Sequence, residues 1–356
     1  MKLLKVFVLA LSSIMISCFA YAENMKVGFI YIGPPGDHGW NYQHDVGRKA
    51  VDEALGGRVE TVFQENVPES ADAERVMTQM VLSGADMIFA TSFGYMDPVM
   101  NVAKKFPDVK FEHATGYIQA DNVATYSARF YEGRMIEGHI AGHMSKTGTI
   151  GYIASFPIPE VVRGINAFYL AAAKINPDIK MKIIWVFTWY DPGKEADAAN
   201  TLINQGADII VQHTDTYAPC QAAQKAGVYA FGQASNQEAF CPDAHLTSIE
   251  DIWGPYYAAR AKAVVDGTWS SGDTWDGMDK GMVVMSPYNT SLMPASLIQE
   301  AVNMEVGIKD GTLHPFTGPI YNQAGELVVP DGEVAPDGML LGMNFYVQGI
   351  DGEVPQ

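Results

Sequence analysis

Aromatic side chains are concentrated in a few short segments that also carry carboxylates, amides and hydroxyls. Aromatic faces can stack on a flat apolar ring, and stacking contributes roughly 1–3 kcal/mol per base, while amides and carboxylates read the donors and acceptors at its edge. The aromatic candidates are Trp40, Phe93, Tyr95, Phe156, Trp189, Tyr190 and Tyr217. The polar candidates are Asp37, His38, Asn41, Asn66, Thr91, Ser92, Thr115, Asp215, Gln233, Ser235 and Asn236. This combination predicts a binding site for a flat heterocycle.

Each candidate also has a purely structural interpretation. An aromatic side chain can pack its loop onto the protein, and Asp215 or Asp191 can cap the helix that follows, which is the favoured interpretation for Asp191. Trp40 and Trp189 are the strongest ring contacts. Trp40 lies at the tip of a Gly/Pro-rich turn, and Trp189 precedes Asp191-Pro192, a signal for a helix start.

Signals for metal binding and catalysis are weak. His139 and His143 are spaced i, i+4 with Glu137 nearby, but the His-Glu-x-x-His order is absent, so we interpret them as a structural or surface pair. A second cluster has no companion ligands; its members are Asp37, His38, His44 and Asp45. The chain has no Gly-x-Ser-x-Gly, no dinucleotide fingerprint and no Walker loop. We therefore expect no metal, no cofactor and no enzyme.

The elements that position the candidates occur twice. Residues 81–95 are echoed by residues 203–217 at an offset of 122, and residues 26–31 are echoed by 149–154 at an offset of 123. Two matches at almost the same offset indicate two similar lobes in tandem.

Short apolar runs alternate with helical patterns in both repeats. The predicted strands are 26–32, 59–63, 86–91 and 109–113, then 149–154, 181–187, 208–213 and 228–231. The predicted helices are 42–55, 70–83 and 96–105, then 160–175, 193–205 and 217–226. This alternation predicts an α/β protein with two doubly wound parallel sheets. Ligands bind beyond the carboxyl ends of such strands, which is where the aromatic segments fall.

The predicted lobes exchange chain more than once. We assign residues 25–126 and 247–285 to the first lobe, and 127–246 and 286–352 to the second. Several crossings form a hinge, and hinge closure over a ligand is the motion that this architecture permits.

The N-terminal segment resembles an export signal. Lys2 and Lys5 precede an apolar run, and Ala20-Tyr21-Ala22 is a small-x-small cleavage site, so we expect residues 1–22 to be removed. Lipid attachment at Cys18 is the alternative. Removing this segment leaves 334 residues, enough for two cores, and no later run of 18 apolar residues.

The net charge limits the classes of binding partner, and the cysteine content predicts a disulfide. Loss of the two lysines changes the net charge from −18 to −20, which argues against binding to nucleic acid or anionic lipid. In an exported chain the remaining cysteines, Cys220 and Cys241, predict a disulfide that closes a loop of about 20 residues and stabilises by roughly 3 kcal/mol. Two buried free thiols are the alternative, and a zinc site would need more ligands.

Several motifs together resemble the basic membrane protein family of ABC-importer substrate-binding proteins. The resemblance covers nearly all of residues 25–352, and its motifs are residues 29–41, 129–133 with Gly142, 177–180 and 311–319. It implies the type I periplasmic-binding fold, delivery of a small molecule to an ABC permease of the inner membrane, and receptors for purine nucleosides or related heterocycles.

The resemblance also implies roles for individual residues. The family's Ser-Phe-Asn falls on Gly39-Trp40-Asn41, so Trp40 would stack on the base and Asn41 would lie beside it, with Tyr217 or Trp189 opposite. Two aspartates and a lysine that hold ribose in the family are replaced here by Thr115, Gln233 and Asp251.

The lost ribose contacts are charge-assisted hydrogen bonds worth about 1.5–3 kcal/mol each, so a free purine base such as adenine is the preferred ligand. The full expected ligand set is Trp40, Asn41, Phe93, Thr115, Trp189, Asp215, Tyr217, Gln233, Asn236 and Asp251. We expect a periplasmic, monomeric binding protein; the alternatives are a receptor for nucleosides or other heterocycles, a ligand sensor and, least favoured, a nucleoside hydrolase.

Overall fold

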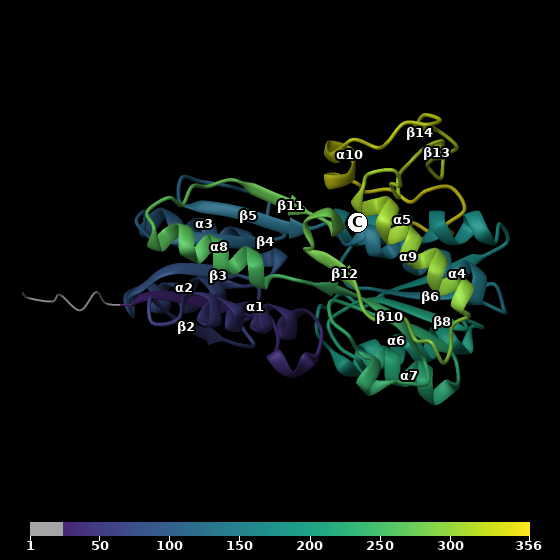
Figure 1. The fold of residues 1–356 in the computed structure, drawn as a ribbon, viewed down its shortest axis with the longest axis horizontal. Helices are drawn as coiled ribbons and strands as arrows, with labels where there is room; N and C mark the ends of the chain where they lie inside the picture. Colours follow the sequence, from purple (N-terminus) through teal and green to yellow (C-terminus); the bar gives the residue numbers. More distant parts are fainter. Residues whose placement is uncertain (1–23) are drawn as a thin grey trace, which may run out of the picture.

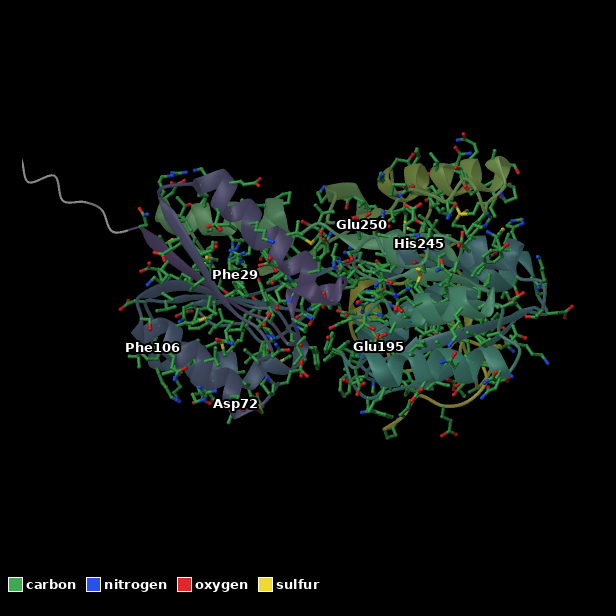
Figure 2. All side chains as sticks on the ribbon, turned by 90° about the horizontal axis from the view of Figure 1, so that it is seen from below. Phe29, Asp72, Phe106, Glu195, His245 and Glu250 are labelled. Atoms are coloured by element: carbon green, nitrogen blue, oxygen red, sulfur yellow. A yellow bond between two sulfur atoms is a disulfide. The ribbon has the colours of Figure 1, made fainter. Side chains whose placement is uncertain are left out.

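The computed structural model describes residues 24–356. The predicted export signal and Cys18 lie outside the described residues. Figure 1 shows two lobes side by side, with the first lobe in purple and blue and the second in teal. Figure 2 labels Phe29, Asp72 and Phe106 on the first lobe, and Glu195, His245 and Glu250 on the second.

The first lobe is built on a six-stranded parallel sheet. Its strands, in spatial order, are β11 (Asp273–Asp276), β5 (Val123–Ala128), β4 (Lys110–Ala114), β3 (Ala85–Ala90), β1 (Met25–Ile30) and β2 (Val59–Gln64). Its helices are α1 (Trp40–Leu55), α2 (Ala71–Leu82), α3 (Met96–Lys105) and α8 (Gly254–Val265). Alternate side chains of β1 face opposite sides: Phe29 joins the core that contains Tyr257 of α8, and Ile30 joins the core that contains Val99 of α3. The sheet is therefore covered on both faces.

The second lobe repeats this plan. Its strands, in spatial order, are β12 (Val283–Met285), β10 (His245–Asp251), β9 (Tyr229–Gly232), β8 (Ile209–His213), β6 (Thr149–Ala154) and β7 (Lys180–Trp185). Its helices are α4 (Tyr131–Met144), α5 (Pro159–Ile175), α6 (Pro192–Asn204), α7 (Ala218–Ala226) and α9 (Ala295–Lys309). Only the β10–β12 pair in this sheet is antiparallel. The predicted doubly wound α/β architecture is confirmed, and every strand and helix predicted in the two repeats is present with ends that differ by at most two residues.

The chain returns to the first lobe later than predicted. Residues 247–251 belong to β10, which pairs with β9 and β12 of the second sheet. The crossing therefore follows Asp251, after which α8 packs on α1 and β11 pairs with β5. The expected boundaries at 247 and 285 are corrected, because the backbone groups of β10 and β12 find their partners in the second sheet.

The C-terminal segment packs on the second lobe. It contains β13 (Ile320–Tyr321), β14 (Leu327–Val329) and α10 (Asp337–Leu341), drawn in yellow above α5 in Figure 1. Two buried side chains of α5 hold it: Arg163 Nη1 donates to Leu340 O at 2.6 Å, and Asn166 Nδ2 donates to Phe345 O at 2.8 Å. Among residues 24–356, no helix combines the length and hydropathy needed to cross a bilayer.

The predicted disulfide is present. Cys220 of α7 is bonded to Cys241, with their Cα atoms 5.9 Å apart and both residues buried. The bond closes the segment between α7 and β10, which contains the loop that follows β9. It therefore stabilises a part of the second lobe that also carries Gln233.

Candidate ligand-binding cleft

A small cavity, with about 20 Å³ of free space, lies between the two lobes at the carboxyl ends of their strands. The first lobe contributes Ile32, Trp40, Ser92, Phe93 and Thr115, and the second contributes Glu160, Trp189, His213, Asp215 and Gln233. Of the ten expected ligand contacts, the structure brings together Trp40, Phe93, Thr115, Trp189, Asp215 and Gln233.

Trp40 is held in a fixed orientation at the first residue of α1. Its Nε1 donates to Thr91 O at 2.7 Å, at the end of β3. The edges or faces of His44, Phe130 and Trp253 contact the ring, with centroid separations of 4.4, 6.0 and 5.7 Å. Because the hydrogen bond and the packing fix the ring, little side-chain entropy remains to be lost on stacking.

Asp37 shapes the turn that carries Trp40. Its carboxylate accepts hydrogen bonds from the backbone N–H groups of Gly39, Asn41 and Tyr42 at 2.9–3.0 Å. Burial raises the pKa of Asp37 to about 6, although these hydrogen bonds favour the charged form.

Asn41 does not line the cavity, contrary to the prediction. It is fully buried; its Nδ2 donates to Asp37 Oδ2 at 2.7 Å, and its Oδ1 accepts from Gly33 N at 3.1 Å. Since both ends of the amide are engaged within the turn, Asn41 supports Trp40 instead of contacting a ligand.

The second aromatic wall is Trp189, in the segment after β7. Trp189 O accepts from Asp215 N at 2.9 Å, which fixes two cavity residues relative to each other. Its ring lies 5.2 Å from Phe156 and 6.5 Å from His213, measured between centroids.

Tyr217, the other predicted opposing aromatic, is not among the cavity residues. Its ring is stacked on Phe240 at 4.0 Å with an interplanar angle of 7°. The structure therefore does not place Tyr217 at the cavity, because the turn after β9 supplies a close aromatic partner for it, and its contact with a ligand stays a prediction.

Asn236 is also not a cavity residue. It is exposed, and its Oδ1 accepts from Glu238 N at 2.9 Å, which caps the short helical turn that follows. Ala234, with a φ of 63°, reverses the chain just after Gln233. This reversal leaves Gln233 facing the cavity and turns Asn236 toward solvent.

Gln233 is oriented by a buried arginine. Arg134 of α4 donates through Nη2 to Gln233 Oε1 and to Gln212 O, and through Nη1 to Glu137 Oε2 at 2.7 Å. Arginine carries only donors, so the amide oxygen of Gln233 must face it. The amide nitrogen is then the group that Gln233 presents to the cavity.

Asp215 supplies the buried carboxyl group of the cavity. It lies in the 214–217 segment, which Glu195 holds through bonds to Thr216 N and Thr216 Oγ1 at 3.1 and 2.7 Å. Burial raises the pKa of Asp215 well above its ordinary value, and the nearby carboxylates of Asp37 and Glu195 raise it further. A carboxyl group in this state can donate a hydrogen bond as well as accept one.

Asp251 lies at the end of β10, near the cavity but not among its lining residues. Its carboxylate is buried, and neither oxygen has a hydrogen-bond partner among the described residues. Burial raises its pKa well above the ordinary value, with the charge of Glu160 adding to the effect. The expected direct ligand contact of Asp251 is therefore not found.

The lobes are in direct contact around the cavity. Gln43 Nε2 of the first lobe donates to Asp251 O at 3.0 Å, and Ser235 Oγ of the second donates to His38 O. Gly39 lies so close to the backbone of Asp215 that an added Cβ would clash with its carbonyl oxygen. These contacts describe a closed arrangement of the two lobes.

The family model of PnrA-like ABC transporter substrate-binding proteins, Bmp, matches residues 24–311. The chain belongs to the Bmp family. Bmp proteins bind small molecules and deliver them to a membrane permease, and they are binding proteins rather than enzymes.

Two relatives resemble this Bmp protein over most of its length. A purine-binding protein of Brucella abortus is 59% identical over 334 residues, covering 94% of this chain and 95% of the relative. A protein of Haloferax volcanii, named as a candidate glucose-binding protein of an ABC transporter, is 36% identical and covers 94% of this chain and 82% of the relative. An ABC transporter solute-binding protein of Aeropyrum pernix has a similar fold, with a TM-score of 0.72 at 21% identity over 82% of this chain and 92% of that structure.

Three cavity residues of this Bmp protein were not singled out from the sequence. Ile32 is the last apolar residue before the first turn, His213 ends β8, and Glu160 is the second residue of α5, in the segment that follows β6. Glu160 Oε1 lies 3.4 Å from His213 Nε2. Burial lowers the pKa of His213, and Glu160 opposes this shift. Their position at the carboxyl ends of strands, counted one residue further, is the signal that could have found them.

Proposed function

We propose that this Bmp protein captures a purine base, adenine or a close relative, and delivers it to an ABC permease of the inner membrane. One observation carries the proposal: Trp40 of the first lobe and Trp189 of the second line the same closed cavity. Aromatic faces from two sides suit a flat heterocycle, and the amide nitrogen of Gln233 and the carboxyl of Asp215 suit its acceptors and donors. The purine-binding relative at 59% identity supports the same assignment.

The ligand that co-purifies with the protein tests this proposal. Protein isolated without added ligand is denatured, and the released small molecules are identified by liquid chromatography and mass spectrometry. We expect a purine base in near-stoichiometric amount. A sugar or an amino acid would overturn the base assignment, while leaving the role as a binding protein intact.

A nucleoside is the second candidate, because a wider recess adjoins the cavity. It shares Phe93, Thr115 and Glu160 with the cavity and extends toward Arg163 and Asp273. The side-chain oxygen of Gln233 already accepts a hydrogen bond from Arg134. It is therefore less able to accept one from a ribose hydroxyl. We expect adenine to bind at least about tenfold more tightly than adenosine, because each ribose hydroxyl that loses water without finding a partner in the protein costs about 1–3 kcal/mol. Titration calorimetry with the two compounds separates the candidates.

We also propose that the protein works in the periplasm after removal of residues 1–22. The family's role at a membrane permease and the expected cleavage site support this compartment. Mass spectrometry of the mature chain from the native host should give an N-terminus at Glu23. A lipid-modified N-terminus at Cys18 would replace the diffusing form with an anchored one. A ligand sensor would have the same cleft. A gene for a kinase next to the gene for this protein, in place of a gene for a permease, would indicate a sensor.

A further inference from the structure

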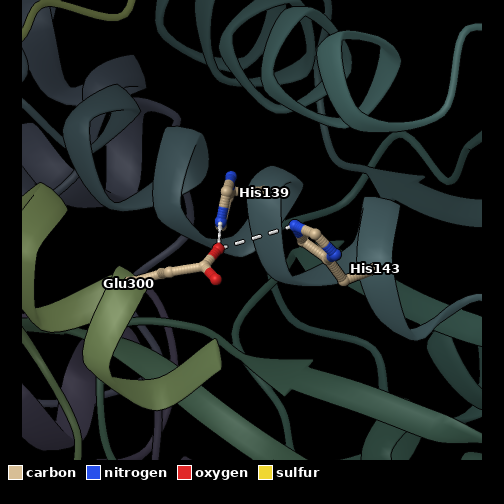
Figure 3. Close-up of side chains that lie close together, drawn as sticks. All are labelled: His139, His143 and Glu300. Atoms are coloured by element: carbon tan, nitrogen blue, oxygen red, sulfur yellow. Dashed lines mark hydrogen bonds and ion pairs between the residues drawn. The ribbon is translucent and has the colours of Figure 1, made fainter. Parts of the chain in front are cut away.

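Three potential metal ligands meet on the second lobe, away from the cleft. His139 and His143 lie one turn apart on α4, and Glu300 reaches them from α9. Figure 3 shows the carboxylate of Glu300 between the two imidazole rings. Within residues 24–356, this is the one group of three or more such side chains that could hold a metal ion.

Two of the three ligand distances are close to those around a tetrahedral ion. Glu300 Oε2 lies 3.0 Å from His139 Nε2 and 3.7 Å from His143 Nε2, and all three ligand atoms lie within 4.8 Å of one another. Bonds of about 2.0–2.1 Å that meet at the tetrahedral angle place neighbouring ligand atoms about 3.3 Å apart. The two observed separations lie on either side of this value, so small side-chain rotations would suffice.

The donor set and its exposure select the class of ion. Two imidazoles and one carboxylate suit Zn²⁺, whereas Mg²⁺ and Ca²⁺ prefer shells made of oxygen. The side chains of His139, His143 and Glu300 are 17%, 41% and 49% exposed, so an ion can reach them from solvent and keep a water molecule. The single carboxylate would leave a site charge of about +1, which the strongly acidic chain, with a net charge of −18, favours.

We propose that His139, His143 and Glu300 form a zinc site that ties α9 to α4. Zinc would take the place of the hydrogen bond between His139 and Glu300, with the two Nε2 atoms and one carboxylate oxygen as ligands and water in the fourth position. The isolated ion pair is worth little at this exposure, so the bound ion would supply most of the linkage between the helices.

The site lies at the opposite end of the lobe from the ligand cavity. His143 is next to the last residue of α4, and β6 begins five residues after that helix ends, so the cluster is near the amino ends of the strands. The cavity lies at their carboxyl ends. Zinc should therefore stabilise the second lobe and leave purine affinity unchanged.

Titration of the full mature protein tests the site. Untagged protein is freed of metal with a chelator and titrated with ZnCl₂ by calorimetry, with MgCl₂ and CaCl₂ as comparison ions. We expect one Zn²⁺ per chain and a raised melting temperature. His143→Ala and Glu300→Gln should each weaken zinc binding at least about tenfold, the lower limit seen when even outer-shell partners of a metal are lost.

Glu305→Gln is the matched control, because it makes the same charge change on the same helix outside the cluster. It should bind zinc as the wild type does. Absence of stoichiometric zinc binding, or equal affinity in wild type, His143→Ala and Glu300→Gln, would overturn the proposal. The melting temperatures of metal-free wild type and variants show whether each variant is folded before zinc is added.

Discussion

The first lobe presents to the cleft a tryptophan fixed by a hydrogen bond and three aromatic neighbours, together with Ile32, Phe93 and the small hydroxyl side chains of Ser92 and Thr115. The second lobe presents Trp189 beside four polar side chains, Glu160, His213, Asp215 and Gln233. The first wall is thus mostly apolar and rigid, whereas the second is mostly polar and depends on buried groups behind it. This difference suggests a division of labour in which one lobe holds the ring face and the other reads its edge.

Arg134→Ala should have the largest effect, a loss of stability, because it removes the group that supports Gln233 in the second wall. The guanidinium is fully buried between Glu137 and Gln233, and its loss leaves a buried carboxylate unpaired, so the free energy of unfolding should fall by about 3–5 kcal/mol. Urea unfolding measures this loss. Arg75→Ala, which removes a pair with Asp72 in which both side chains are more than half exposed, is the control and should cost under about 1 kcal/mol. A similar small loss for Arg134→Ala would contradict the supporting role of this arginine.

Asp37→Asn should remove a pH dependence from the free energy of unfolding, because the carboxyl of Asp37 titrates in the turn that carries Trp40. The pKa of Asp37 is about 6 in the folded protein and about 3.9 in an unfolded chain. Between these values the folded state binds more protons, so the free energy of unfolding falls as pH rises. Relative to Asp37→Asn, the wild type should lose about 2 kcal/mol between pH 4 and pH 6. Urea unfolding of both proteins across this range checks the sign, and a constant difference would refute it.

Trp40→Ala should weaken purine binding at least about tenfold, because the lost stacking is worth roughly 1–3 kcal/mol. Titration calorimetry gives the dissociation constant. Trp269→Phe is a control in the same lobe, since Trp269 packs near Glu112 outside the cavity, and its affinity should match the wild type. An unchanged affinity in Trp40→Ala would remove the first wall from the site.

Trp189→Ala should have a smaller effect, about fivefold, near 1 kcal/mol. No hydrogen bond of its indole N–H is found among the described residues, so its ring has more freedom to lose on binding than that of Trp40. Tyr217→Ala is the comparison, because both residues were expected opposite Trp40 and only Trp189 lines the cavity. Purine titrations of both variants should rank them in this order; a larger effect at Tyr217 would move the second wall to α7.

The regular elements could be predicted closely because their signals are local. The helix predicted over 96–105 is α3, and the strand predicted over 149–154 is β6, with the same ends. The repeat placed the carboxyl ends of the strands, and therefore most of the cavity. The predicted crossing at 247 is misplaced because the sequence of β10 does not say which sheet supplies its partner.

Side-chain direction in the loops could not be predicted in the same way. Asn41 and Asn236 were chosen for their chemistry, but each is used by the backbone of its own turn. The ring of Tyr217 stacks on Phe240, which lies in a separate turn, and so it does not line the cavity. The meeting of His139 with Glu300, 161 residues apart, depends on how α9 packs on α4, and no spacing rule reports such a contact.

Gly39 also sets how far the two lobes can close. A side chain at this position would act as a wedge against the carbonyl of Asp215, as would the serine that the family pattern places there. Without a side chain here the two backbones can touch across the cleft, so the thickness of the ligand, and not only its hydrogen-bonding edge, decides whether the lobes can reach this arrangement. A permease that docks only on the closed form would then admit a thin, planar solute and reject a bulkier one before any transport begins.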